Sequence, residues 1–175
     1  MNMCRQPLTA VAIAVCMSAM GCSSDLVTPR PKMFTGESGG CGSCFVYRFN
    51  DTRTLAVTVR IDETAIDLSA QPVDIEIDSQ TKTVVVEVLQ FLDPAVDYFC
   101  DDVAGDPRPM AEWKAVAGSI TFERTVVAPP KNFPSATHKV SVTLRNVQLK
   151  NNETGGTATL DEVRIEDVWV GWLPG

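Results

Sequence analysis

The stretch VDIEIDSQTKTVVVEVLQF, residues 73–91, decides the fold class of this chain. Val73, Ile75 and Ile77 alternate with acidic residues, which is the period of two of a half-buried strand. Residues 82–91 are apolar almost throughout, as in a strand that is covered on both faces. The link between the two runs is short and polar, and it predicts that they pair as a β-hairpin.

The same alternation extends over most of the chain on both sides of this stretch. Strands are predicted at residues 44–49, 55–61, 113–125, 137–150 and 156–170. Helical stripes are scarce, and the joints between the runs are short and polar or rich in proline or glycine. Many strands with such joints predict an all-β fold, an antiparallel β-sandwich, with a closed up-and-down β-barrel as the alternative.

The apolar residues of the long C-terminal strands change parity along the chain. Leu144 ends an even-numbered apolar series, whereas Val147 belongs to an odd-numbered one, and the change from Ile165 to Val168 reverses the parity again. A side chain cannot change its face of a sheet unless an extra residue is inserted, so these slips predict β-bulges. Gly118 marks a further candidate bulge.

The beginning of the chain has a different character. Residues 1–21 contain Arg5 and then an apolar run over residues 8–20, which is shorter than the ~20 residues that cross a bilayer. A basic start, a short apolar run and small residues at its end are typical of a signal peptide. Residues 22–40 hold prolines and glycines with little apolar periodicity, so they predict a flexible tether, and residues 41–175 form the predicted β-domain.

The end of this leader, Ala19-Met20-Gly21-Cys22, resembles the lipobox of bacterial lipoproteins. The resemblance implies that signal peptidase II cleaves before Cys22 and that Cys22 carries the acyl chains, palmitate among them. The position three residues before the cysteine is usually Leu in that family and is Ala19 here. Ser23 stands where an Asp would retain such a protein in the inner membrane, so the resemblance implies the outer membrane of a Gram-negative envelope.

The C-terminal third also carries a weaker resemblance. Residues 118–122 (GSITF), 138–144 (HKVSVTL) and 157–160 (TATL) are similar to segments of small lipoproteins with an antiparallel β-domain. No activity is known for such proteins, so the resemblance transfers no functional residue.

The sequence has six cysteines, and three of them remain in the predicted mature chain once Cys22 is assigned to the lipid. Cys41, Cys44 and Cys100 predict a structural disulfide, either from Cys100 to one of the other two or locally between Cys41 and Cys44. The Cys-Gly-Ser-Cys spacing also suits a redox pair, but such a pair normally precedes a helix and here it precedes a strand. With His138 the three thiols have the residue types of a zinc site. We predict no metal and no cofactor.

Large aromatic side chains are the candidates for contacts with a ligand. Rings of this kind stack on sugars and pack in protein interfaces. The candidates are Trp113, Trp169 and Trp172, together with Tyr98 and Phe99.

Charge and missing motifs narrow the function. The formal net charge is -7 and no basic run occurs, which argues against nucleic acid as a partner. No nucleophile elbow, Walker loop, metalloprotease or dinucleotide motif is present, so no catalytic residue is predicted. The sequence therefore predicts a lipid-anchored envelope protein that acts as a non-catalytic module for binding a protein or glycan. The alternative is a hydrolase of envelope polymers, which requires two carboxylates that converge in a cleft.

Overall fold

The computed structural model describes residues 26–69, 71–78, 80, 82–101, 107–129, 131 and 134–171. These residues form eight strands and two short 3-10 helices. In chain order the elements are η1 (Pro31–Met33), β1 (Ser38–Cys41), β2 (Phe45–Phe49), β3 (Leu55–Ile61), η2 (Glu63–Ala65), β4 (Val73–Asp78), β5 (Val84–Gln90), β6 (Ala111–Thr125), β7 (His138–Asn151) and β8 (Thr157–Val170). Among the described residues, no helix has the length and apolar character needed to cross a membrane.

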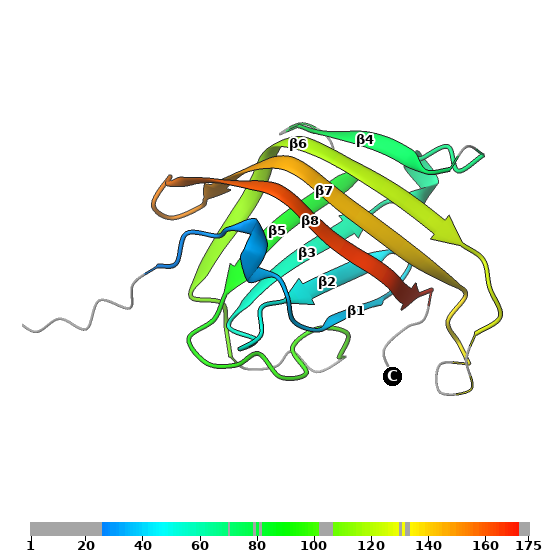
Figure 1. Ribbon diagram of the computed structural model, residues 1–175, viewed down its shortest axis with the longest axis horizontal. Coiled ribbons are helices and arrows are strands. Elements are labelled where there is room, and N and C mark those ends of the chain that lie inside the picture. The colour runs from blue at the N-terminus through cyan, green and yellow to red at the C-terminus, as the bar shows by residue number, and fades with distance from the viewer. Residues whose placement is uncertain are drawn as a thin grey trace, which may run out of the picture.

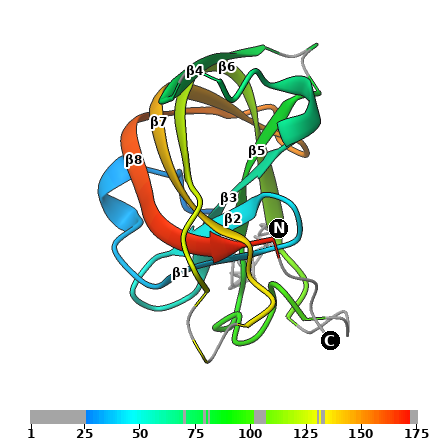
Figure 2. The ribbon, with the colours of Figure 1, turned by 90° about the vertical axis from the view of Figure 1, so that its right-hand side faces the viewer.

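All eight strands belong to one antiparallel sheet, so the all-β antiparallel class predicted from the sequence is confirmed. The strand order is β1-β2-β3-β5-β6-β7-β8, and β4 pairs with β6 outside this path. The sheet curls strongly, so that β6, β7 and β8 lie over β1, β2 and β3 (Figure 1 and Figure 2). Two layers thus face each other across the core, as in the predicted sandwich, while strand pairing continues from one layer to the other through β5 and β6.

The two end strands of the curled sheet, β1 and β8, lie close to each other. The Gly171 amide donates to the Gly42 carbonyl over 2.7 Å, and Arg48 Nη1 donates to the Arg164 carbonyl over 2.7 Å. The two strands are nevertheless not neighbours in the hydrogen-bonded order of the sheet. We call the boundary between β1 and β8 the seam.

The predicted hairpin between residues 73–77 and 82–91 is wrong. β4 pairs with the second half of β6, from Val73 opposite Phe122 onward, whereas β5 pairs with β3 and with the first residues of β6. Both strands are antiparallel to β6, so the chain runs in the same direction through β4 and β5. A polar link does not show whether the chain reverses, and the 15-residue β6 has an edge long enough for two short strands in succession.

The predicted β-bulges are present where the apolar parity changes. The pairing of β6 with β7 shifts next to Gly118, which has a φ of 132°. Asn146 in β7 and Asp167 in β8 also have positive φ, 49° and 56°, at the two parity changes. Leu144 and Val147 are both fully buried as a result, although one is even-numbered and the other odd-numbered.

The main core lies between the two layers and is built largely of aliphatic side chains from alternate strand positions. Val57, Leu144 and Ile165 are completely buried, and Phe122 is the largest fully buried side chain. Burial of each such side chain contributes about 1.5–3 kcal/mol relative to its exposure, which makes the main core the chief stabilising feature of the fold. Trp113 belongs to the same core and is 5 % exposed.

The structure places residues 26–40 differently from the predicted flexible tether. Pro29 and Phe34 are buried, η1 lies against β8, and β1 pairs with β2 over Ser38–Cys41. Residues 26–40 are therefore part of the domain, and Cys22 lies outside the described residues.

Two glycines that suggested flexibility instead allow close packing. A Cβ on Gly39 would lie 2.4 Å from the Tyr47 hydroxyl oxygen, and a Cβ on Gly40 would lie 2.8 Å from Val168 Cγ1. Both distances are too short for any other residue unless its neighbours move. The glycines thus let Tyr47 lie across β1 and let β8 approach the seam.

Candidate binding groove between β1 and β8

The outer face of β2 carries three aromatic side chains in a row. Phe45, Tyr47 and Phe49 are two residues apart, so they point to the same side of the strand. Phe99 packs over all three, with ring centroids 5.6, 4.7 and 5.4 Å away respectively. Tyr98 continues the stack at 5.0 Å from Phe99.

A second, smaller apolar region forms around these rings, on the opposite face of the sheet from the main core. Its buried members come from β2, β3, β5 and the loop that follows β5, and Tyr47, Tyr98 and Phe99 pack against them. We call this region the outer cluster. Its members are Phe45, Tyr47, Phe49, Ala56, Leu89, Phe91, Ala95, Tyr98 and Phe99.

A disulfide holds the loop of the outer cluster against β1. Cys41 and Cys100 are bonded, with their Cα atoms 5.7 Å apart and a sequence separation of 59. This is one of the pairings left open by the sequence, and Cys44 stays free and buried. Because Cys100 directly follows Phe99, the bond fixes the ring of Phe99 beside Tyr47.

A groove of about 390 Å³ opens where the seam meets the outer cluster. Three aromatic rings reach it from different elements: Tyr47 from β2, Phe99 from the loop after β5, and Trp169 from β8. Three carboxylates also line it, from Glu37, Glu166 and Asp167, and part of its wall is the backbone of Gly39 and Gly40. No lysine or arginine is among the lining residues.

The carboxylates of the groove are open to solvent. The side chain of Glu37 is 55 % exposed and forms an ion pair with Arg53, while the side chain of Asp167 is 81 % exposed and lies 3.9 Å from Lys139 Nζ. Tyr47 is more enclosed: burial, and then the negative charge of Glu37, raise the pKa of its hydroxyl above the ordinary value. The groove therefore combines an aromatic wall with three exposed carboxylates, two of which lie next to a cation of the protein itself.

Cations already lie over aromatic rings at this place. Arg53 lies 6.0 Å from the centroid of Phe49, and Arg60 lies 5.7 Å from that of Phe45. Lys139 Nζ lies 5.3 Å from the centroid of Trp169. The outer cluster and the groove thus present ring faces that attract positive charge.

The predicted ligand-contact residues have different positions. Trp169 lines the groove and Phe99 forms its wall, whereas Trp113 is buried in the main core, where its ring is not available to a surface ligand. Trp172 lies outside the described residues. Tyr47 was missed, although the alternation of aromatic residues in β2 was the signal that could have identified it.

A partly buried polar cluster lies at the end of the curled sheet near η2. Glu63 accepts a hydrogen bond from Arg124 Nη1 over 3.2 Å, and its other carboxylate oxygen lies 3.0 Å from His138 Nε2. The second ring nitrogen of His138 lies 2.7 Å from Thr137 Oγ1. Both nitrogens of His138 therefore have protein partners.

Cys44 belongs to the same cluster, and its environment does not favour thiol chemistry. Burial, followed by the charge of Glu63 and a hydrogen bond to it, raises the pKa of the Cys44 thiol to about 12. Exchange with a disulfide requires a thiolate, so the protonated thiol is a poor partner for Cys41 and Cys100. Because two of the three cysteines are bonded to each other, the zinc site considered from the sequence is not assembled either.

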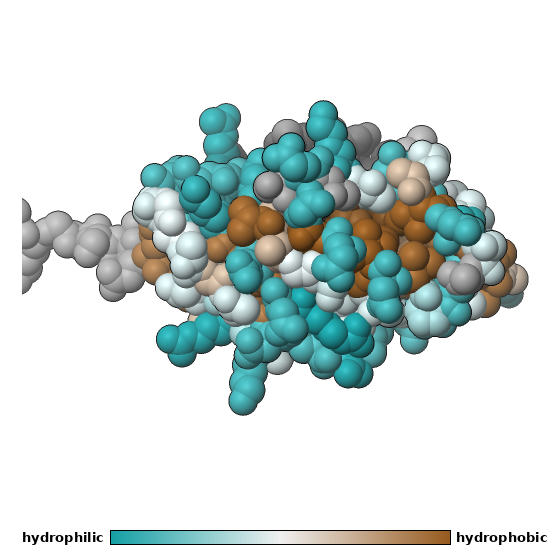
Figure 3. All heavy atoms as spheres, turned by 90° about the horizontal axis from the view of Figure 1, so that it is seen from above, coloured by the Kyte–Doolittle hydropathy of each residue, from teal (hydrophilic) through white to brown (hydrophobic). Residues whose placement is uncertain are grey.

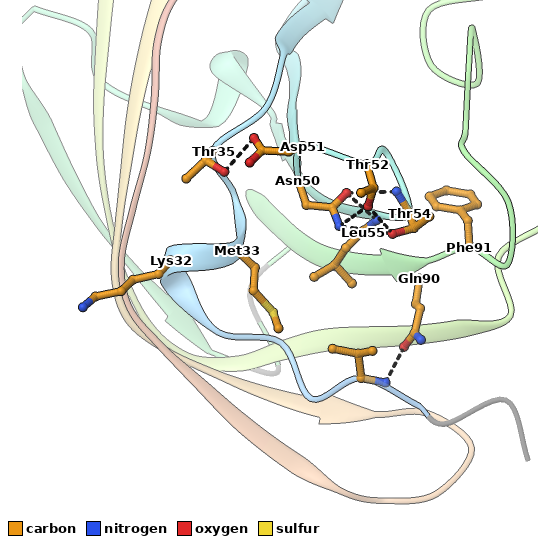
Figure 4. Close-up of a pocket in the computed structure, with 11 residues that line it drawn as sticks. Lys32, Met33, Thr35, Asn50, Asp51, Thr52, Thr54, Leu55, Gln90 and Phe91 are labelled. Carbon is orange, nitrogen blue, oxygen red and sulfur yellow. Dashed lines mark hydrogen bonds between the residues drawn. The ribbon is translucent and has the colours of Figure 1, made fainter.

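A second cavity of about 390 Å³ lies at the other end of the curled sheet, between residues 27–35 and the β2–β3 turn (Figure 4). Its polar groups bind one another. Asn50 Oδ1 accepts from the amides of Thr54 and Leu55, and Thr35 Oγ1 donates to Asp51 over 2.8 Å. These contacts hold the β2–β3 turn and the entering chain, so the groove at the seam is the better candidate for a binding site.

Comparison with protein-family models, curated protein sequences and solved structures gives no match for this chain. The functional assignment therefore rests on the sequence motif and on the geometry of the groove.

Proposed function

We propose that this chain is a lipid-anchored protein of the bacterial cell envelope and that its β-domain is a non-catalytic binding module. The lipid anchor is inferred from one observation, the sequence Ala19-Met20-Gly21-Cys22 at the end of an apolar leader. Acyl chains on Cys22 hold the protein in the membrane, which in a Gram-negative cell is the outer membrane. Two or more acyl chains are enough for stable anchoring.

The position of the first described residues fits such an anchor. The described chain starts at Leu26, four residues after Cys22. From there it runs along the end of the curled sheet that is shown in Figure 4. Four extended residues reach at most about 14 Å. Leu26 and Val27 are exposed hydrophobic residues, and Arg30 and Lys32 follow them. In the proposed arrangement, the end of the curled sheet next to Leu26 and Val27 lies at the membrane surface.

The groove at the seam supports the proposal that the β-domain is a non-catalytic binding module. It joins aromatic rings with carboxylates that are exposed to solvent, whereas a carboxyl group that acts as a general acid at neutral pH is enclosed by apolar surroundings. Hydrophobic residues also form a band along the face of the molecule seen from above, bordered by hydrophilic side chains (Figure 3). This band lies on the face seen from above, and not at β1, which lies at the lower side of the molecule in Figure 1.

Intact mass spectrometry of the protein purified from its native membrane tests the anchor. We expect loss of residues 1–21 and added acyl chains on Cys22, and no acyl mass on a Cys22→Ser variant. A mature protein that starts elsewhere, or one without acyl chains, would contradict the proposal.

A further inference from the structure

We propose that the groove at the seam binds a positively charged group, a protonated amine or a guanidinium, with its charge between the carboxylates and its stem against the aromatic wall. This inference deepens the proposed binding function and rests on it. The binding site itself, however, is argued from the described residues and does not depend on the lipid anchor.

The charges around the groove favour a cation over an anion or a neutral ligand. Glu166 and Asp167 line it from β8 and Glu37 lines it from the segment before β1, and no basic side chain is among the lining residues. The whole chain carries a net charge of -7, which adds to the local field. Glu37 is already paired with Arg53, and Lys139 Nζ lies 3.9 Å from Asp167, so a bound cation would share these two carboxylates with the protein's own side chains.

The aromatic wall provides the second attraction. The ring centroids of Tyr47 and Phe99 lie 4.7 Å apart, and Trp169 lines the groove from β8. The face of an aromatic ring attracts a cation within about 6 Å of its centroid. Three of the protein's own cations use neighbouring rings in this way, so the surroundings are already suited to ammonium and guanidinium groups.

The size of the groove fits one side chain or a small amine. Its volume of about 390 Å³ lies at the lower end of the range for ligand sites. The backbone of Gly39 and Gly40 lets a ligand come close to β1, since neither residue has a side chain to block it. Lys139 pairs with Trp169 across β7 and β8, so it approaches that ring from the side of β7.

Isothermal titration calorimetry with two matched probes tests the proposal on the full-length mature protein in detergent. The first probe is Nα-acetyl-lysine amide, and the second is its Nε-acetylated analogue, which has the same stem without the charge. We expect millimolar binding of the first probe, at least five-fold weaker binding of the second, and loss of affinity as salt is raised.

Variants of the carboxylates locate the binding. Glu166→Gln and Asp167→Asn each remove one charge from the groove and are expected to weaken binding of the lysine probe about five-fold. Asn tolerates the positive φ of residue 167, so the backbone is preserved. Glu76→Gln on the exposed side of β4 is the matched control and should leave the affinity unchanged. Lys139→Met should strengthen binding about two-fold, because it frees Asp167 and one face of Trp169.

Three results would overturn the proposal. One is equal binding of the neutral and charged probes, and another is an unchanged affinity in the Glu166→Gln and Asp167→Asn variants. The third is the absence of binding up to 100 mM probe, on the order of a hundred times the expected dissociation constant. The mass spectrum of the native protein is independent of these outcomes, so a failure here and a failure of the lipid anchor can be told apart.

Discussion

The main core and the outer cluster are two apolar regions on opposite faces of the same sheet, and they are held in different ways. The main core is aliphatic, comes from regular strand positions and is enclosed by the curl of the sheet. The outer cluster is aromatic, is covered by a loop, and is fixed by the Cys41–Cys100 bond. The regular strands of the main core therefore supply most of the stability, while the irregular, cross-linked outer cluster shapes the groove.

The largest expected effect is in the main core. Phe122→Ala removes the largest fully buried side chain and should lower the free energy of unfolding by about 3–5 kcal/mol. Phe99→Ala in the outer cluster should cost about half as much, because Phe99 is only half-buried. Urea unfolding of the two variants measures the comparison, and an equal or larger cost for Phe99→Ala would contradict it.

The next effect concerns the disulfide. In the chain-entropy model a cross-link over 59 residues contributes about 4 kcal/mol, and values of about 2–4 kcal/mol are typical. The double variant Cys41→Ser, Cys100→Ser should lose that stability and should bind the lysine probe more weakly, since Phe99 is released. Its far-ultraviolet circular dichroism should stay that of a β-protein. Unchanged affinity in the double variant would show that the groove does not depend on the bond.

The buried thiol near η2 gives a pH-dependent effect. The pKa of Cys44 is raised to about 12 in the folded protein, from an ordinary value of 9.0. Below pH 9 the thiol is protonated in both states and its contribution is fully present. Between pH 9 and 12 only the unfolded thiol loses its proton, so stability falls by about 1.4 kcal/mol per pH unit.

The matched variant for this effect is Cys44→Ala, which has no thiol to titrate. Urea unfolding at pH 8.5 and 10.5 should show that the wild type loses about 2 kcal/mol more than the variant over this interval. The tyrosines titrate in both proteins, so their effect cancels. Equal losses would mean that Cys44 ionises in the folded state as readily as in the unfolded state.

The smallest expected change in the free energy of unfolding comes from a variant that alters the shape of the groove and leaves the fold intact. Gly39→Ala places a Cβ against the ring of Tyr47, which can move because it is the end of a side chain. We expect a loss of less than about 1 kcal/mol in unfolding free energy but a clear loss of lysine-probe affinity. Comparison with Tyr47→Phe, which keeps the ring and removes the hydroxyl, shows whether ring position or the hydroxyl matters. A full-affinity Gly39→Ala protein would argue against a groove shaped by Tyr47.

The two regions also differ in how far the sequence predicts them. The main core follows from alternation: the strands at 55–61, 113–125 and 137–150 and the bulge near Asn146 are all visible as patterns of apolar residues. The pairing of β4 with β6 was not predictable from the local pattern, because alternation shows which side chains point inward but not which edge a strand joins. The polar link at residues 78–81 was interpreted as a hairpin turn for the same reason.

The groove was predicted only in part. Trp169 and Phe99 were recognised as aromatic candidates and Cys41 and Cys100 as possible partners, but nothing in the sequence brings Tyr47 beside them. That contact depends on the position of the loop that carries Phe99 and on the close approach of β1 to Tyr47. From the sequence, Gly39 and Gly40, the glycines of β1, were interpreted as part of a tether. Small residues in a sequence fit a mobile segment and a tightly packed one equally well.

Hydrogen–deuterium exchange with and without a saturating concentration of Nα-acetyl-lysine amide shows whether the outer cluster and its groove form the binding region while the main core only supports it. We predict slower exchange in β1 and in residues 95–101 when the probe is present, and unchanged exchange in β6 and β7. Protection spread evenly over the sheet, or confined to β6 and β7, would contradict the account.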